Sequence, residues 1–161
     1  MSISARSKFT KCVAALLLVV LLGIVLLQSA SAVFGKYTYF SSGSRSYKAR
    51  SEAAISFYIS QNKDYAIAVT YLETSNGANV PASTMGVQGT LYRYNGSNSY
   101  TLESSFTLKF NGSATNVQSY CCEVPAVKGR SYVAEGYVEA KNDQTGTMVP
   151  EFTDKAGPVS Y

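Results

Sequence analysis

The stretch from Thr90 to Phe110 constrains the fold most strongly, because it combines a strand pattern with a clear turn. In its second half, apolar residues share one parity and polar residues fill the other, which is typical of a half-buried strand. The apolar residues are Leu102, Phe106, Leu108 and Phe110. Asn95 and Gly96 tolerate the positive backbone dihedrals of a tight turn, so the pattern predicts a hairpin with Leu91–Tyr94 as the partner strand.

Similar strand patterns recur along the chain, separated by glycine, asparagine and proline. We expect further strands at 37–40, 53–60, 65–73, 116–124 and 130–141. The small residues Ala66 and Ala68 favour a central place in a sheet for the third of these. The residues from Thr147 onward contain two prolines and predict at most one edge strand. The expected fold is all-β, a single antiparallel β-sandwich of seven or eight short strands, with a small β-barrel as the alternative.

The first 32 residues have the features of an export signal. A basic segment precedes an apolar run, and a small-residue triplet follows it. These parts are Arg6 to Lys11, Cys12 to Leu27 and Ala30 to Ala32. We expect a signal-peptide helix at 1–32, cleavage after Ala32 and a domain at 33–161. The alternative is an uncleaved membrane anchor, although the apolar run is shorter than the ~20 residues of a typical bilayer span.

Removing this segment changes the charge of the chain. The whole sequence has fourteen basic and ten acidic residues. Three of the basic residues, and none of the acidic ones, precede residue 33, so eleven basic and ten acidic residues remain and the formal net charge is +1. A nearly neutral domain gives no electrostatic reason to expect nucleic acid as a partner.

Composition also limits the chemistry that the chain can perform. There is no histidine, so the usual general base near neutral pH is missing. Glu135 and Glu139 share one face of an expected strand, but four residues of strand hold them ~13 Å apart, wider than a glycosidase pair requires. No phosphate loop or dinucleotide fingerprint is present. We predict no catalytic residue, no cofactor and no metal site.

Cys121 and Cys122 are the most unusual local feature, and three states are open for them. Neighbouring cysteines can form a strained vicinal disulfide, remain as two thiols, or form a bond between two chains through Cys121. In a regular strand the two side chains point to opposite faces. The pattern around them indicates a buried Cys122 and a more exposed Cys121.

Tyr92, Arg93 and Tyr94 form the candidate ligand surface in the sequence. All thirteen tyrosines follow the signal-like segment, and tryptophan is absent. Tyrosine suits both recognition and ordinary cross-strand packing, and the lack of tryptophan weakens a sugar-binding interpretation. Asn95 and Asn111 each begin an Asn-Gly-Ser glycosylation motif, which we interpret as turns.

The functional hypothesis from the sequence is a secreted or surface-associated protein that binds an extracellular protein or glycan and is not an enzyme. Export, size and the missing catalytic constellations favour it. The alternative is a secreted bacteriocin-like or membrane-active antagonist. The near-neutral charge and the lack of an amphipathic cationic segment argue against that alternative. The long apolar region of the signal is compatible with a bacterial exporter.

Overall fold

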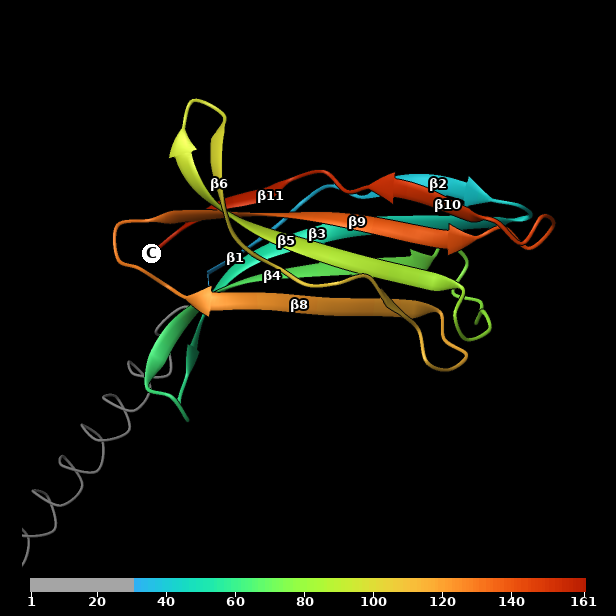
Figure 1. Cartoon of the computed structure of the whole chain (residues 1–161), viewed down its shortest axis with the longest axis horizontal. Helices are drawn as coiled ribbons and strands as arrows, with labels where there is room; N and C mark the ends of the chain where they lie inside the picture. The colour runs from blue at the N-terminus through green and yellow to red at the C-terminus, as the bar shows by residue number, and fades with distance from the viewer. Residues whose placement is uncertain (1–30) are drawn as a thin grey trace, which may run out of the picture.

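The computed structural model describes residues 31–161, whose regular secondary structure is all β (Figure 1). Nearly all of the expected signal peptide therefore lies outside the described residues. Within the described part, no helix is long and apolar enough to cross a membrane. The strands are β1 (Ser31–Phe34), β2 (Thr38–Ser42), β3 (Arg45–Tyr58), β4 (Lys63–Thr74), β5 (Met85–Gly96), β6 (Ser99–Ser105), β7 (Lys109–Phe110), β8 (Val117–Pro125), β9 (Ser131–Lys141), β10 (Met148–Phe152) and β11 (Ala156–Ser160).

The strands form two antiparallel sheets. The first sheet has five strands in the order β1-β3-β4-β8, and β2 pairs with the other half of β3. The second sheet has six strands in the order β10-β9-β5-β6, and β11 and β7 pair with β9 and β5. Buried residues of both sheets share two hydrophobic clusters, so the sheets pack face to face. The expected all-β sandwich is confirmed.

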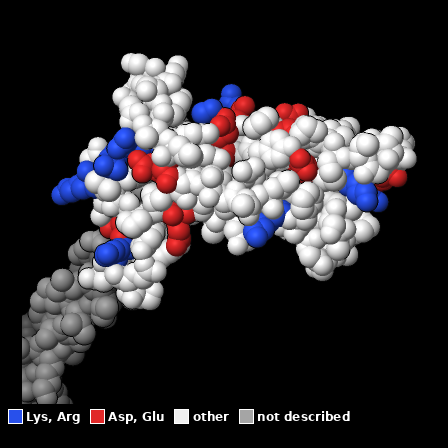
Figure 2. Space-filling model, in the orientation of Figure 1, with Lys and Arg blue, Asp and Glu red and all other residues white. Residues whose placement is uncertain are grey.

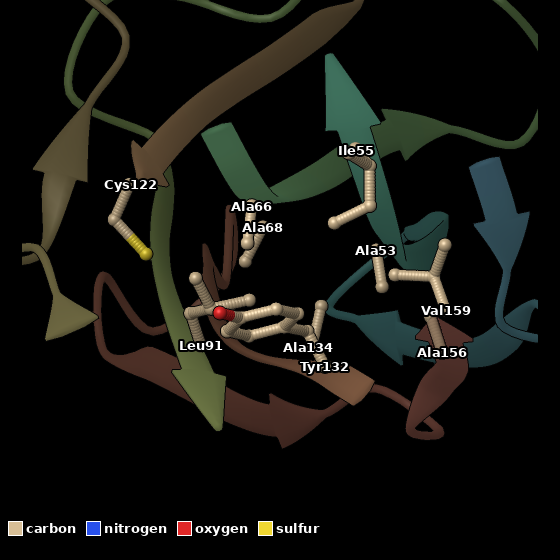
Figure 3. Packing of buried hydrophobic residues seen from close by; sticks show 10 residues of the cluster. All are labelled: Ala53, Ile55, Ala66, Ala68, Leu91, Cys122, Tyr132, Ala134, Ala156 and Val159. Atoms are coloured by element: carbon tan, nitrogen blue, oxygen red, sulfur yellow. The ribbon is translucent and has the colours of Figure 1, made fainter. Parts of the chain in front are cut away.

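The core lies between the small residues of β4 and the larger side chains of β9 and β5. Ala66 and Ala68 are fully buried at the centre of the first sheet, between β3 and β8. Their small size leaves room for the ring of Tyr132, which Figure 3 shows beside Leu91 and Ala134 in the same cluster. The central position predicted from these alanines is confirmed, and their face is the core face.

The two sheets approach each other closely where two glycines face one threonine. Gly89 of β5 and Gly136 of β9 are directly opposite in the second sheet. A Cβ atom on Gly136 would lie 2.5 Å from Cγ2 of Thr70, and one on Gly89 would lie 2.9 Å from its Oγ1. Thr70 is fully buried there. The missing side chains let β4 sit directly over the β5–β9 ladder.

The predicted hairpin forms, but its turn and register differ from the expectation. The turn residues with positive φ after Gly96 are Ser97 (49°) and Asn98 (59°), two residues later than predicted. The pairing shifts between Leu91 and Tyr92, which is a β-bulge. The shift turns Leu102 outward, and its side chain is 60% exposed instead of buried.

The structure contains more strands than the seven or eight expected, eleven in residues 31–161. β5 begins at Met85 instead of Leu91, because Gly86 and Gly89 lie within the ladder although glycine disfavours strands. β3 already begins at Arg45. The C-terminal segment adds two strands, β10 and β11, where at most one was expected. Both lie at the margin of the second sheet, where proline is tolerated.

Candidate functional site

A hollow of about 270 Å³ opens on the outer face of the second sheet, across β5, β9 and β10. Cross-strand pairing builds it, because Gln88 lies opposite Tyr137 and Thr90 lies opposite Glu135. On the other side of β9, Tyr137 is paired with Phe152. The lining residues are Gln88, Thr90, Tyr92, Glu135, Gly136, Tyr137 and Phe152. Amide, hydroxyl, carboxylate and aromatic groups therefore meet on one rigid surface.

Glu135 is the one charged residue in the lining, and two neighbours fix its carboxylate. Lys155 donates to Oε1 at 2.5 Å and the hydroxyl of Tyr92 donates to Oε2 at 3.2 Å. The carboxylate raises the pKa of Lys155, because it stabilises the ammonium form. Burial, followed by the charge of Glu135, raises the pKa of Tyr92. Glu135 thus stands as a hydrogen-bond acceptor whose position is already set.

Aromatic rings form the other side of the hollow. Phe152 is 60% exposed, and its ring centroid lies 5.1 Å from that of Tyr137 at an interplanar angle of 61°. The hydroxyl of Tyr137 donates to Glu139 at 2.5 Å. This hydrogen bond is the main cause that raises the pKa of Tyr137 to about 12. Phe152 therefore presents an apolar surface next to groups that can form hydrogen bonds.

The three residues of the sequence-based ligand surface do not share one face. Tyr92 lines the hollow. Tyr94 follows two residues later on the same face of β5, and its ring centroid is 5.7 Å from that of Tyr100. Arg93 follows the strand alternation to the opposite side of β5. There its Nε lies 3.5 Å from Oε1 of Glu103. The structure brings together the tyrosines and separates them from the arginine.

Glu135 and Glu139 both lie on the outer face of β9, but different neighbours engage them. Glu135 is bound to Lys155, and Glu139 accepts from Tyr137. In the part of the chain that the structure describes, no three histidine, cysteine, aspartate or glutamate residues gather as a metal site would require.

A second hollow of about 380 Å³ lies where β3 begins and β4 ends. Its charged residue, Arg45, has Nε 3.6 Å from Oδ2 of Asp143. Hydrogen bonds from Ser44 hold the pKa of Asp143 below its usual value. This hollow is larger, but its polar groups bind one another, as when Thr74 donates to the carbonyl of Ala78 at 2.8 Å. We therefore place the candidate site on the sheet face, where the side-chain amide of Gln88 and the exposed ring of Phe152 lie beside the fixed carboxylate of Glu135.

The two neighbouring cysteines lie on opposite faces of β8, and both are free thiols in the structure. Cys121 is exposed, whereas Cys122 is 7% exposed and its sulfur points into the core cluster (Figure 3). Burial raises the pKa of the Cys122 thiol. The burial pattern expected from the sequence is therefore found.

Sequence analysis missed several residues of the hollow, namely Gln88, Thr90, Tyr137, Phe152 and the adjacent Lys155. The polar residues at alternating positions of β9 were the available signal for an outward face. No local pattern indicates that β5 and β10 flank this strand. On the face that Figure 2 shows, the acidic and basic side chains of the described residues are intermixed, with no large field of one charge. No family model, curated protein or solved structure matches the chain.

Proposed function

We propose that the protein is exported and acts by binding, with the hollow on the outer face of β5, β9 and β10 as its ligand surface. The observation that carries this proposal is the convergence of a fixed carboxylate, an amide, hydroxyls and an exposed ring in one depression. Binding sites typically combine a small number of placed polar groups with an apolar surface. The residues of the ligand surface belong to strands, so the hydrogen-bonded sheet fixes their geometry.

A ligand with hydroxyl or amide groups fits this surface best, and a glycan on an extracellular partner has that chemistry. Glu135 can accept hydrogen bonds, Gln88 can both accept and donate them, and the ring of Phe152 can lie against the C–H face of a sugar. The volume of about 270 Å³ suits one sugar unit or one polar side chain rather than a large cofactor. Binding without turnover is favoured by the missing histidine and by the separate engagement of Glu135 and Glu139.

The test is binding of the exported protein to a panel of glycans and extracellular proteins, repeated with two variants. Phe152→Ala removes the exposed ring, and Glu135→Gln removes the charge with little change in shape. We expect each variant to weaken binding by roughly tenfold or more, as the loss of one central contact does. Tyr39→Ala is the matched control, because Tyr39 is 68% exposed on β2 of the first sheet.

Comparing variants on the second sheet with the control on the first sheet shows which surface binds the ligand. Weaker binding in Phe152→Ala together with unchanged binding in Tyr39→Ala supports the proposed surface. Equal affinity of the Phe152→Ala and Glu135→Gln variants to the unmodified protein places the ligand elsewhere and contradicts it. Absence of any captured ligand across the whole panel contradicts the binding function itself.

A further inference from the structure

β8 is the one long and regular strand that lies at the margin of a sheet in residues 31–161. It ends the first sheet, and its nine residues pair only with β4 (Figure 1). The other marginal strands are protected in the ways that proteins use against edge pairing. β1, β2 and β7 are short, β10 and β11 contain proline, and the pairing of β6 is irregular. β8 has its proline only at the last position.

The hydrogen bonds that flank β8 show which of its backbone groups are free. Thr74 donates to the carbonyl of Asn116 at 2.9 Å, and Ala126 donates to the carbonyl of Asp64 at 2.8 Å. Both bonds join directly opposite residues in the β4–β8 register. Because bonded and non-bonded pairs alternate in an antiparallel ladder, the even-numbered residues of β8 are bonded to β4. The N–H and C=O groups of Ser119, Cys121 and Glu123 therefore point away from the sheet.

We propose that two copies of this chain pair through β8 in an antiparallel arrangement, with the two-fold axis at Cys121. Cys121 is the central residue of Val117–Pro125. This register joins Cys121 to the partner's Cys121 and Ser119 to the partner's Glu123. Three outward residues in each copy then exchange about six backbone hydrogen bonds, which satisfies the free groups of both edges.

Charge favours this register over the one with its two-fold axis at Glu123. A two-fold axis at Glu123 would place two carboxylates directly opposite each other, which is unfavourable. An axis at Cys121 places each Glu123 opposite a serine. It also covers two apolar side chains that the single copy leaves open, since Val117 is 43% and Tyr120 is 46% exposed. The surface on the second sheet that carries the proposed ligand site is not involved, so the two proposals stand or fall separately.

The same register places two exposed thiols directly opposite each other. Paired residues that exchange hydrogen bonds have Cα atoms ~5.5 Å apart, which lies within the ~4.4–6.8 Å range of disulfides, and their Cβ atoms must approach by about 1 Å for the bond to form. A disulfide such as oxidised glutathione supplies the oxidant. One Cys121 thiolate attacks it and releases one glutathione thiol, and the partner's Cys121 thiolate then attacks the mixed disulfide and releases the second. Two protein thiols become one disulfide, and one glutathione disulfide becomes two thiols.

The experiment measures the mass of the processed protein in solution, first with reductant and then after incubation with oxidised glutathione. We expect a reversible dimer under reducing conditions and a covalent dimer after oxidation. Cys121→Ser removes the covalent bond but keeps the reversible dimer. Cys121→Lys places two cations at the two-fold axis and raises the dimer dissociation constant by roughly tenfold or more. Cys122→Ala is the matched control and keeps both forms, because Cys122 is buried.

Three results would overturn the proposal. One is a monomer at every concentration tested, with no covalent dimer after oxidation. Another is a reversible dimer of unchanged affinity in Cys121→Lys, which would place the interface elsewhere. The third is a monomer lighter by about two mass units, which indicates the vicinal disulfide. A circular dichroism spectrum for each variant shows that the strands are retained.

Discussion

Two fully buried tyrosines differ in whether their hydroxyl has a hydrogen-bond partner. Tyr47 and Tyr132 are 0% and 1% exposed, one in each hydrophobic cluster. The hydroxyl of Tyr132 accepts a hydrogen bond from the amide of Val127 at 2.9 Å. The hydroxyl of Tyr47 is buried without a hydrogen-bond partner. Burial of a polar group without a partner costs free energy, whereas a satisfied one does not.

We therefore expect opposite effects when the two hydroxyls are removed. Tyr47→Phe should raise the free energy of unfolding by roughly 1 kcal/mol, because it removes an unsatisfied group and keeps the ring. Tyr132→Phe should lower the free energy of unfolding by roughly 1 kcal/mol, because it removes the hydrogen bond from the partly buried amide of Val127. Chemical denaturation of both variants measures these changes. A lower stability of Tyr47→Phe than of the unmodified protein would contradict a buried hydroxyl without a hydrogen-bond partner at Tyr47.

Tyr71, on the outer face of the first sheet, is one of the tyrosines that contribute to stability at high pH. Burial, and then the hydrogen bond that it donates to Glu52 at 2.7 Å, raise the pKa of Tyr71 from 10.0 to about 12. Between these two values the unfolded chain has lost the proton and the folded chain keeps it, so the unfolded state binds fewer protons. The contribution of Tyr71 to the free energy of unfolding is therefore constant below pH 10 and falls as the pH rises toward 12.

The measurement is the free energy of unfolding at several pH values from about 9 to 12. We expect a decline over this window that is shallower in Tyr71→Phe, which has no hydroxyl to titrate. Glu52→Gln should lower the pKa of Tyr71, because it removes the neighbouring negative charge. An identical slope in Tyr71→Phe and in the unmodified protein would show that this tyrosine does not contribute.

At the scale of elements, Asn111 connects the loop after β4 to the segment before β8. Its side-chain oxygen accepts from the amides of Thr84 and Met85, both at 2.9 Å. Its nitrogen donates to the carbonyls of Pro81 and Ser113, both at 2.8 Å. Asn111 is 2% exposed, so all four bonds replace bonds to water.

Replacing Asn111 by alanine should lower the free energy of unfolding by roughly 2–4 kcal/mol, because buried amides lose their acceptor. Asn95→Ala is the matched control, since Asn95 also begins an Asn-Gly-Ser sequence but is exposed and bonds only to Thr101. We expect a change within about 0.5 kcal/mol for the control. In a host that glycosylates this motif, a glycan should be found on Asn95 and not on folded Asn111. Modification of Asn111 in the folded protein would contradict its burial.

The elements also show why some of the fold could be predicted from sequence and some could not. The strand at 130–141 was predicted from its alternation, and Tyr132, Ala134, Val138 and Ala140, which share one parity, are all buried. β5 was cut short in the prediction because Gly86 reads as a loop residue, although here the ring of Phe110 covers it. The bulge beside Leu91 was not predicted, because register depends on partners elsewhere in the chain.

The candidate site was predicted only in part for a similar reason. Tyr92 was singled out from its neighbours in the sequence, and it does line the hollow. Phe152 lies sixty residues away from it in the chain and reaches the same surface only because β10 and β5 flank β9. Spatial order in a sheet is set by topology, which a period-two pattern does not encode.

At the scale of the whole molecule, the expected cleavage point falls within a strand of the folded domain. Ala32 pairs with Ala54, and Val33 pairs with Ala53 and packs against the core. The ring of Phe34 lies 4.4 Å from the guanidinium carbon of Arg50. Cleavage after Ala32 would thus remove the pairing of Ser31 and Ala32 but keep the two residues whose side chains contact the domain.

We expect the exported protein to begin at Val33, which N-terminal sequencing or intact mass determines. A signal peptidase needs its site in an accessible extended segment, so processing should precede the docking of β1 onto β3. Replacing Ala30 and Ala32 by phenylalanine should leave the precursor uncleaved and associated with the membrane. A shorter form that begins at Gly35 should be less stable by roughly 1–3 kcal/mol, because it loses the burial of Val33 and the contact of Phe34. Recovery of the unmodified protein with residues 1–32 intact would contradict cleavage and would support the anchored alternative.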